Sequence, residues 1–221
     1  MAFDIYQKIV NEDGEPVEKK AGAYRQQLFE LFMESPEGQA LIDEGIQPGW
    51  ADMMMDYGIN YLGVTPPKMS SGNLSEILFD LFPSKVSADA AKAPEIIREL
   101  QAFWKFLQRE FHLENAAGCL KLLDDKAARR LEKEMSNPAN FGMAKSFIMM
   151  GKARGFDMAT EEGINKWMVT YNAELAQGTG PRIPLPAPSF SIYQGGSARK
   201  VQEKSRRKIA RDSRKKNRRK R

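Results

Sequence analysis

The sequence has very few of the side chains from which metal and thiol sites are built. Its 221 residues include one cysteine, Cys119, and one histidine, His112. A single cysteine excludes an internal disulfide and any zinc site with several thiolates, which fits a reducing compartment. A single histidine excludes the H-E-x-x-H pattern and other histidine-rich metal sites. We therefore expect no metal and no other cofactor.

Long apolar runs are also missing. No stretch approaches the roughly 18 consecutive apolar residues that a membrane-spanning helix needs. Asp4 and Lys8 lie where a signal peptide would need its apolar segment. These absences predict a cytoplasmic protein without a membrane span.

Charge, by contrast, is abundant and unevenly distributed. The chain carries 34 Lys and Arg against 29 Asp and Glu, a formal net charge of +5. Residues 197–221 hold 14 of the basic residues and only two acids, Glu203 and Asp212, which gives this segment a net charge of +12. Positions 1–196 together have a net charge of −7. This asymmetry predicts a C-terminal tail that binds polyanions, carried by a body that polyanions would repel.

The basic tail indicates contact with nucleic acid. Apart from Val201 and Ile209 it has no apolar pattern, so we expect it to be disordered until phosphates bind it. It has no aromatic residue to stack on bases, which favours binding without sequence specificity. RNA, including ribosomal RNA, is preferred over DNA because arginine-rich segments commonly fold on structured RNA. The predicted nucleic-acid-binding residues are Arg199, Lys200, Lys204, Arg206, Arg207, Lys208, Arg211, Arg214, Lys215, Lys216, Arg218, Arg219, Lys220 and Arg221.

Other roles for the tail stay open. It could dock on the acidic body or act only as a solubilising charge run. It could also bind an acidic protein or an anionic membrane surface, where each basic residue contributes about 1 kcal/mol. No lipidation motif or bulky apolar face would hold it in a membrane.

Apolar residues recur at helical spacing through the body of the chain. The clearest helix spans residues 93–112, where Ile96, Leu100 and Phe103 form part of an apolar stripe and Glu99 faces the other way. Other helices are expected at residues 17–34, 36–42, 50–62, 73–82, 114–123, 126–135 and 137–155, and from residue 160 onward. The predicted fold class is therefore all-α, a single multi-helix orthogonal array.

Capping and breaking residues predict where these helices begin and end. Asn73 with Glu76 three residues later is typical of an N-terminal capping box, and Pro83 would end that helix. Asn137 and Pro138 predict the first residues of the helix that follows position 136. The last helix is expected to begin near Thr160 and to bury Ile164, Trp167, Met168 and Tyr171.

Four segments follow from these patterns. Residues 1–16 form an N-terminal arm with a turn at Asp13 and Gly14, to which no role is assigned. Residues 17–176 form the helical domain. Residues 177–196 are a Pro- and Gly-rich linker, and residues 197–221 are the basic tail.

The C-terminal half of the helical domain carries one resemblance. The stretch F-G-M-A-K-S-F at residues 141–147, followed by G-F-D-M at 155–158 and Tyr171-Asn172, resembles the end of helical modules in uncharacterised bacterial proteins. The resemblance covers apolar and small residues of low specificity. It implies a bacterial origin and a helical fold, and it assigns no activity and no site.

Few residues are candidates for chemistry. Asp52 and Asp56, one helical turn apart, could offer two carboxylates to a metal, but a solvated acidic face is the preferred interpretation because no Glu-x-x-His pair accompanies them. A Cys–His dyad between Cys119 and His112 would span roughly 10 Å on one continuous helix, which is too far. We expect Cys119 to be a buried small hydrophobe and His112 to lie near a helix C-terminus.

Methionine is abundant, with 12 residues in the chain. Met53, Met54 and Met55 are adjacent, and three consecutive helical positions cannot all face one core. At least one of them is therefore expected at a margin or in a groove. Core filling is the preferred interpretation, and an adaptable partner groove is the alternative.

These patterns favour a non-enzymatic accessory protein. Its tail would tether it to RNA or ribosomes, and its helical body would bind a partner protein. The alternative is a protein–protein adaptor or regulator that acts through a methionine-bearing helical surface, with the tail incidental. An enzyme that uses the acidic residues around Asp52 and Asp56 is the third hypothesis. The pathway, the partners and the oligomeric state are not predicted.

Overall fold

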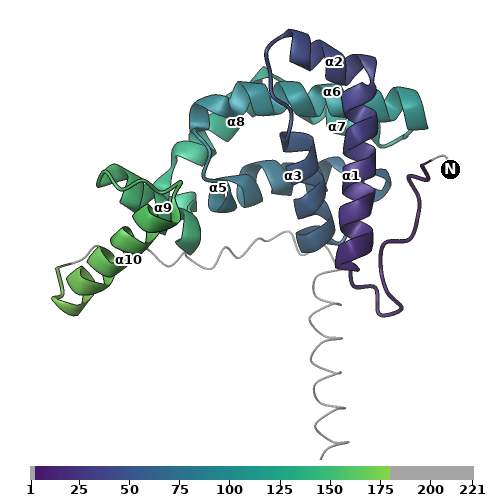
Figure 1. Cartoon of the computed structure of the whole chain (residues 1–221). Coiled ribbons are helices and arrows are strands. Elements are labelled where there is room, and N and C mark those ends of the chain that lie inside the picture. The colour runs from purple at the N-terminus through teal and green to yellow at the C-terminus, as the bar shows by residue number, and fades with distance from the viewer. Residues whose placement is uncertain (1–2, 180–221) are drawn as a thin grey trace, which may run out of the picture. The chain divides into compact units, whose positions relative to one another are not determined.

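The computed structural model describes residues 3–179, which form an all-α fold (Figure 1). Within this range the only β pairing is an isolated bridge between Val10 and Pro16. The α-helices are α1 (Glu18–Glu34), α2 (Pro36–Asp43), α3 (Trp50–Tyr57), α4 (Ser71–Glu76), α5 (Phe82–Lys85), α6 (Ala93–Phe111), α7 (Ala116–Leu122), α8 (Asp125–Ser136), α9 (Met143–Ala153) and α10 (Glu161–Ala176). The predicted all-α class is confirmed. Of these described helices, none has the length and apolar composition needed to cross a membrane.

Short helical turns complete the secondary structure of residues 3–179. Two are π-helical, Gly58–Leu62 after α3 and Ile77–Leu81 between α4 and α5. Three are 3₁₀ turns: Pro66–Lys68, Ala90–Lys92 and Pro138–Asn140. The π turns extend α3 and α4, so the helical runs predicted at residues 50–62 and 73–82 are each continuous through a wider turn.

Helix α6 lies at the centre of the main core and contacts α2, α3, α7 and α8. The predicted stripe is confirmed, because Ile96, Leu100 and Phe103 are fully buried. The Phe103 ring packs edge-on against Phe32 of α1, with 5.1 Å between ring centroids. Aromatic pairs of this geometry stabilise a core beyond the area that they bury.

The predicted start of α4 is wrong by three residues. Ser70, not Asn73, is the N-cap: its hydroxyl accepts the Asn73 N–H, and the Asn73 side chain accepts the Ser70 N–H. Asn73 thus occupies the position of the returning side chain in a capping box that begins three residues earlier.

Pro83 does not end the helical run, which continues to Lys85. A proline ring normally clashes with the carbonyl four residues before it and removes one hydrogen bond. Here the π turn Ile77–Leu81 comes directly before α5 and widens the backbone at that point. The proline is therefore accommodated at the start of α5.

Asn137 and Pro138 start a single 3₁₀ turn rather than the long predicted helix. The chain is extended at Phe141 and Gly142, and α9 begins at Met143. The Gly142 N–H donates to the Ser84 carbonyl at 2.8 Å. A Cβ at residue 142 would lie 2.7 Å from that carbonyl oxygen, so only glycine permits this close approach.

Helices α9 and α10 have a small core of their own, built from Met158, Trp167 and Tyr171. Trp167 Nε1 donates to the Phe147 carbonyl of α9 at 2.9 Å. The prediction that α10 buries four residues is half right. Ile164 and Met168 are 36% and 44% exposed, because they lie beside the buried stripe and not within it.

The N-terminal arm packs on the helices. Ile5 and Ile9 are buried in the main core, and the Tyr24 hydroxyl donates to the Ile5 carbonyl at 3.1 Å. The predicted turn is confirmed, with Gly14 at a φ of +82°, where glycine is favoured.

Candidate functional site

The fourteen residues predicted to bind nucleic acid, at positions 199–221, lie outside the described residues, as do the tail that carries them and most of the predicted linker. The described part of the chain holds the other candidate groups. These are the Asp52–Asp56 pair, Cys119, His112 and the methionines.

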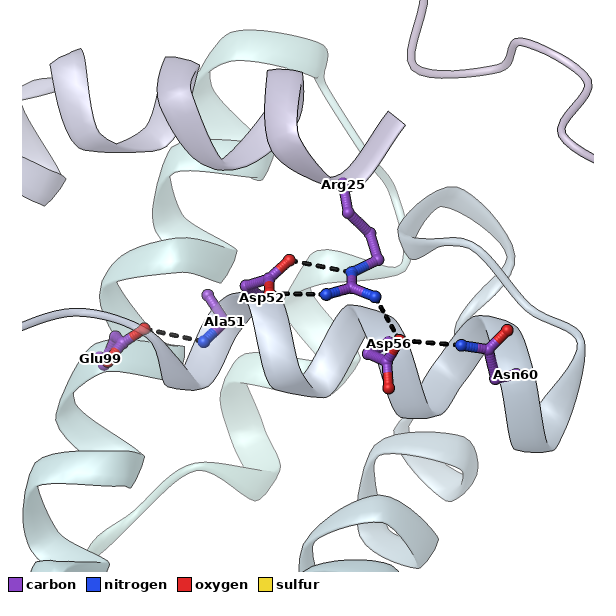
Figure 2. Close-up of polar contacts among 6 residues, drawn as sticks. All are labelled: Arg25, Ala51, Asp52, Asp56, Asn60 and Glu99. Atoms are coloured by element: carbon purple, nitrogen blue, oxygen red, sulfur yellow. Dashed lines mark hydrogen bonds and ion pairs between the residues drawn. The ribbon is translucent and has the colours of Figure 1, made fainter. Parts of the chain in front are cut away.

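The two candidate carboxylates lie one turn apart and both bind Arg25 of α1 (Figure 2). Arg25 Nε donates to Asp52 Oδ1 at 2.9 Å, and Arg25 Nη2 donates to Asp52 Oδ2 at 2.7 Å. Arg25 Nη1 donates to Asp56 Oδ1, which also accepts a hydrogen bond from Asn60 Nδ2 at 2.8 Å. These charge-assisted hydrogen bonds fasten α1 to α3.

A solvated acidic face is therefore the wrong interpretation of Asp52 and Asp56. Their side chains are 35% and 30% exposed, and that of Arg25 is 24% exposed. Hydrogen bonding to Asp52 raises the pKa of Arg25 above its ordinary value. Because Arg25 lies 27 residues before Asp52, no local spacing could have predicted this clamp.

Glu99 of α6 is fully buried, although its position in the sequence predicted a solvent-facing side chain. Its Oε1 accepts the Ala51 N–H at 2.7 Å (Figure 2). The same oxygen accepts the Gly49 N–H at 2.9 Å. Its Oε2 has no hydrogen-bond partner among the described residues. Burial raises the pKa of this carboxyl above its ordinary value.

Glu99 supplies a cap that α3 lacks. The first amides of a helix have no partner within it, and Gly49, the N-cap of α3, has no side chain to accept them. A glycine at the N-cap position is the one sequence feature that could have predicted a hydrogen-bond acceptor from elsewhere in the chain. It does not predict that this acceptor is Glu99.

Cys119 is fully buried, as predicted, and its Sγ lies 3.9 Å from the Met69 carbonyl. Burial raises the pKa of the thiol to about 12. Cys119 is therefore a small core side chain with no thiolate at neutral pH.

His112 is the C-cap of α6, as predicted, and adopts the left-handed conformation with a φ of +53°.

We expect Cys119 to resist an aromatic disulfide reagent at pH 8 in the native protein and to react in full once the chain is unfolded in denaturant. Only the thiolate reacts, and its burial suppresses both its formation and access to it. Absorbance of the released thiolate measures the reaction. Rapid stoichiometric labelling without denaturant would contradict the buried placement.

The methionine triplet fills the core. Met54 and Met55 are fully buried, and Met53 is half-buried at the margin beside Trp50. This arrangement confirms core filling with one residue at the edge, and it excludes a groove lined by all three methionines.

Lys145 of α9 is 1% exposed, and its charge was not a candidate on sequence grounds. Its Nζ donates to the carbonyls of Pro83 at 2.8 Å and Met135 at 3.4 Å, and lies 4.1 Å from the centroid of the Phe141 ring. The two carbonyls belong to the last turns of α5 and α8, where helix dipoles favour a cation. Burial lowers the pKa of the amine to about 8.

Helix α10 exposes several apolar side chains to solvent. We define the α10 face as Ile164, Met168 and Leu175, which are 36%, 44% and 41% exposed. Their positions fall within about 40° of one another on the helix. The α10 face is therefore a continuous apolar stripe beside the buried Trp167 and Tyr171.

Within residues 3–179, no group of three or more His, Cys, Asp or Glu side chains could hold a metal ion. Comparison with protein-family models finds no match, and no curated protein or solved structure is significantly similar to the chain. The resemblance of residues 141–172 to bacterial helical modules therefore stays a prediction.

Proposed function

We propose that this chain is a cytoplasmic, non-enzymatic accessory protein. Its basic tail binds RNA or ribosomes through phosphate contacts without sequence specificity, and its helical body binds a partner protein. The observation that carries the proposal is the charge partition of +12 in residues 197–221 against −7 in residues 1–196. Cationic segments of this density release counterions from nucleic acid when they bind.

The α10 face supports the second half of the proposal. A helix that presents apolar residues to water beside its buried stripe is typical of a surface that receives an amphipathic partner helix. The partner we propose is a protein helix with an apolar stripe that covers Ile164, Met168 and Leu175. Helix α10 ends at Ala176, so only the predicted linker, residues 177–196, separates the α10 face from the basic tail in the sequence.

Removing the tail tests the tether. We expect full-length protein to bind structured RNA with steep salt dependence, losing about 10³-fold or more in affinity between roughly 50 and 200 mM salt. Protein ending at Gly196 keeps the helical body and loses the +12 segment, so it should not bind measurably over the same range. Fluorescence anisotropy with labelled RNA and duplex DNA measures both.

A full-length variant whose residues 197–221 are shuffled is the matched control. It keeps composition and charge, so non-specific phosphate binding predicts an affinity within about threefold of the natural tail. Failure of full-length protein to bind RNA at low salt would contradict the proposal. Equal binding by the truncated protein would show that the tail is not the tether.

The alternative function is an adaptor that works through a methionine-bearing surface. Two exposed methionines would support such a surface: Met143 on α9 is 58% exposed, and Met168 on α10 is 44% exposed. An adaptor of this kind keeps its partner after the tail is removed. The tether function is lost with the tail, so the same truncated protein separates the two.

A further inference from the structure

Helix α8 has four basic residues, Lys126, Arg129, Arg130 and Lys133, which we call the α8 basic face. Their spacings of three, four and seven residues place all four within about 100° of the helix circumference. All four are exposed. The face is thus a rigid strip of positive charge on a body whose net charge is negative.

The opposite side of α8 fixes this strip in place. Ala127, Leu131 and Met135 are buried in the main core. The Asp124 side chain accepts the Ala127 N–H at 2.8 Å and caps the helix. The basic face therefore points away from the core and cannot turn inward.

No carboxylate forms an ion pair with the α8 basic face within residues 3–179. Other arginines of the body are paired: Arg25 with Asp52 and Asp56, Arg98 with Glu44, Arg109 with Glu37, and Arg154 with Glu174. None of the four residues of the face forms an ion pair in the described part of the chain.

The acidic side chains near α8 either form hydrogen bonds with other groups or lie outside the sector of the basic face. Asp124 caps the helix, and Glu134 accepts a hydrogen bond from Asn140 Nδ2 at 2.6 Å. Arg130 lies 3.9 Å over the Phe79 ring, and its charge acts on Asp80 without forming an ion pair. Asp125 and Glu132 project outside the 100° sector.

We propose that the α8 basic face binds the phosphate backbone of the same RNA that the tail binds. This inference rests on the proposed function and adds a second, folded contact to it. Charge complementarity carries it, because an unpaired cationic strip on an otherwise acidic body fits a polyanion. A membrane is the poorer occupant, since none of the large exposed apolar side chains in residues 3–179 belongs to α8.

The full-length triple variant K126Q/R129Q/K133Q tests the inference. Arg130 is kept because its packing on Phe79 would confound the result. On the RNA that the tail binds, three lost phosphate contacts should make the plot of log affinity against log salt less steep by about 2 to 3 and reduce affinity about tenfold at low salt. Anisotropy titrations across a salt series measure both quantities.

The matched control is K19Q/K105Q/K152Q, which removes the same net charge from exposed lysines on α1, α6 and α9. It should leave the slope within about 0.5 of the natural protein, because a dispersed change removes no cluster of contacts. Circular dichroism and thermal unfolding verify that both triple variants fold.

The two proposals fail separately in this design. If removal of the tail abolishes binding while the α8 variant behaves like its control, the α8 inference is wrong and the tether stands. If the α8 variant loses affinity while tail removal changes nothing, the tether is wrong and the α8 contact stands. Binding of the face to phosphatidylserine vesicles but not to RNA, or no RNA binding by the natural protein, would overturn the α8 inference.

Discussion

Replacing Gly163 by alanine is expected to destabilise the protein by about 3 kcal/mol. A Cβ at this position would lie 1.9 Å from the Asp157 carbonyl oxygen and 2.7 Å from its carbonyl carbon. Both are backbone atoms, so no side chain can move to make room. The Gly163 N–H also donates to Thr160 Oγ1 in the cap of α10, and a shift of this turn would break that bond.

Gly22→Ala in α1 is the matched control. Nothing lies within 4 Å of a Cβ at Gly22, so the same substitution should stabilise the protein by about 0.5–1 kcal/mol through helix propensity. Urea unfolding gives both changes, and hydrogen exchange across Glu161–Ala176 locates the first in α10. Equal stability of the two variants would contradict the close approach at Gly163.

The free energy of unfolding of the natural protein, measured relative to that of Lys145→Met, is expected to rise with pH. The pKa of Lys145 is about 8 in the folded protein, whereas an unfolded lysine has a pKa of about 10.4. Between these values the unfolded state binds more protons, so rising pH favours the folded state of the natural protein. The difference between these two pKa values corresponds to about 3 kcal/mol in total, most of it gained between pH 8 and 10.4.

Subtracting the unfolding free energies of the two proteins at each pH cancels the contributions of other titrating groups. The raised pKa of Cys119 makes stability fall over the same pH range, but it does so equally in both proteins. Denaturant titrations at pH 7, 8, 9 and 10 give the difference at each pH. Lys152→Met, at an exposed position of α9, should show no such trend. A flat difference for Lys145→Met would show that its amine is solvated in the folded state.

Helical spacing predicted most of the body because it depends on neighbouring residues. The stripe of α6 and the N-cap at Thr160 follow from side chains within four positions of one another. Helix ends were less predictable. Ser70 and Asn73 both suit a cap, and only the packed structure selects Ser70.

Buried polar contacts could not be predicted because they join residues far apart in sequence. Glu99 is charged, which favoured a surface position, but on the helix circumference it lies between the buried Phe103 and Phe106, and the uncapped start of α3 supplies its hydrogen-bond donors. Lys145 likewise looks like an ordinary helix lysine. The terminal carbonyls of α5 and α8 become its partners only after three helices have met.

The four basic residues of α8 are visible in the sequence, but the composition of this segment does not reveal that they share one face. Residues 124–136 mix acids and bases, so their net charge reveals no patch. Only the rotation fixed by Ala127 and Leu131 separates the basic side from the acids.

The cap that Glu99 provides has a consequence for synthesis of the chain. Glu99 leaves the ribosome 48 residues after Ala51, the residue whose amide it receives. Until then the first turn of α3 keeps amides that only water can satisfy, so this helix frays while the nascent chain grows. The cap of α3, and the part of the main core that α6 contributes, can therefore be completed only after α6 has been synthesised.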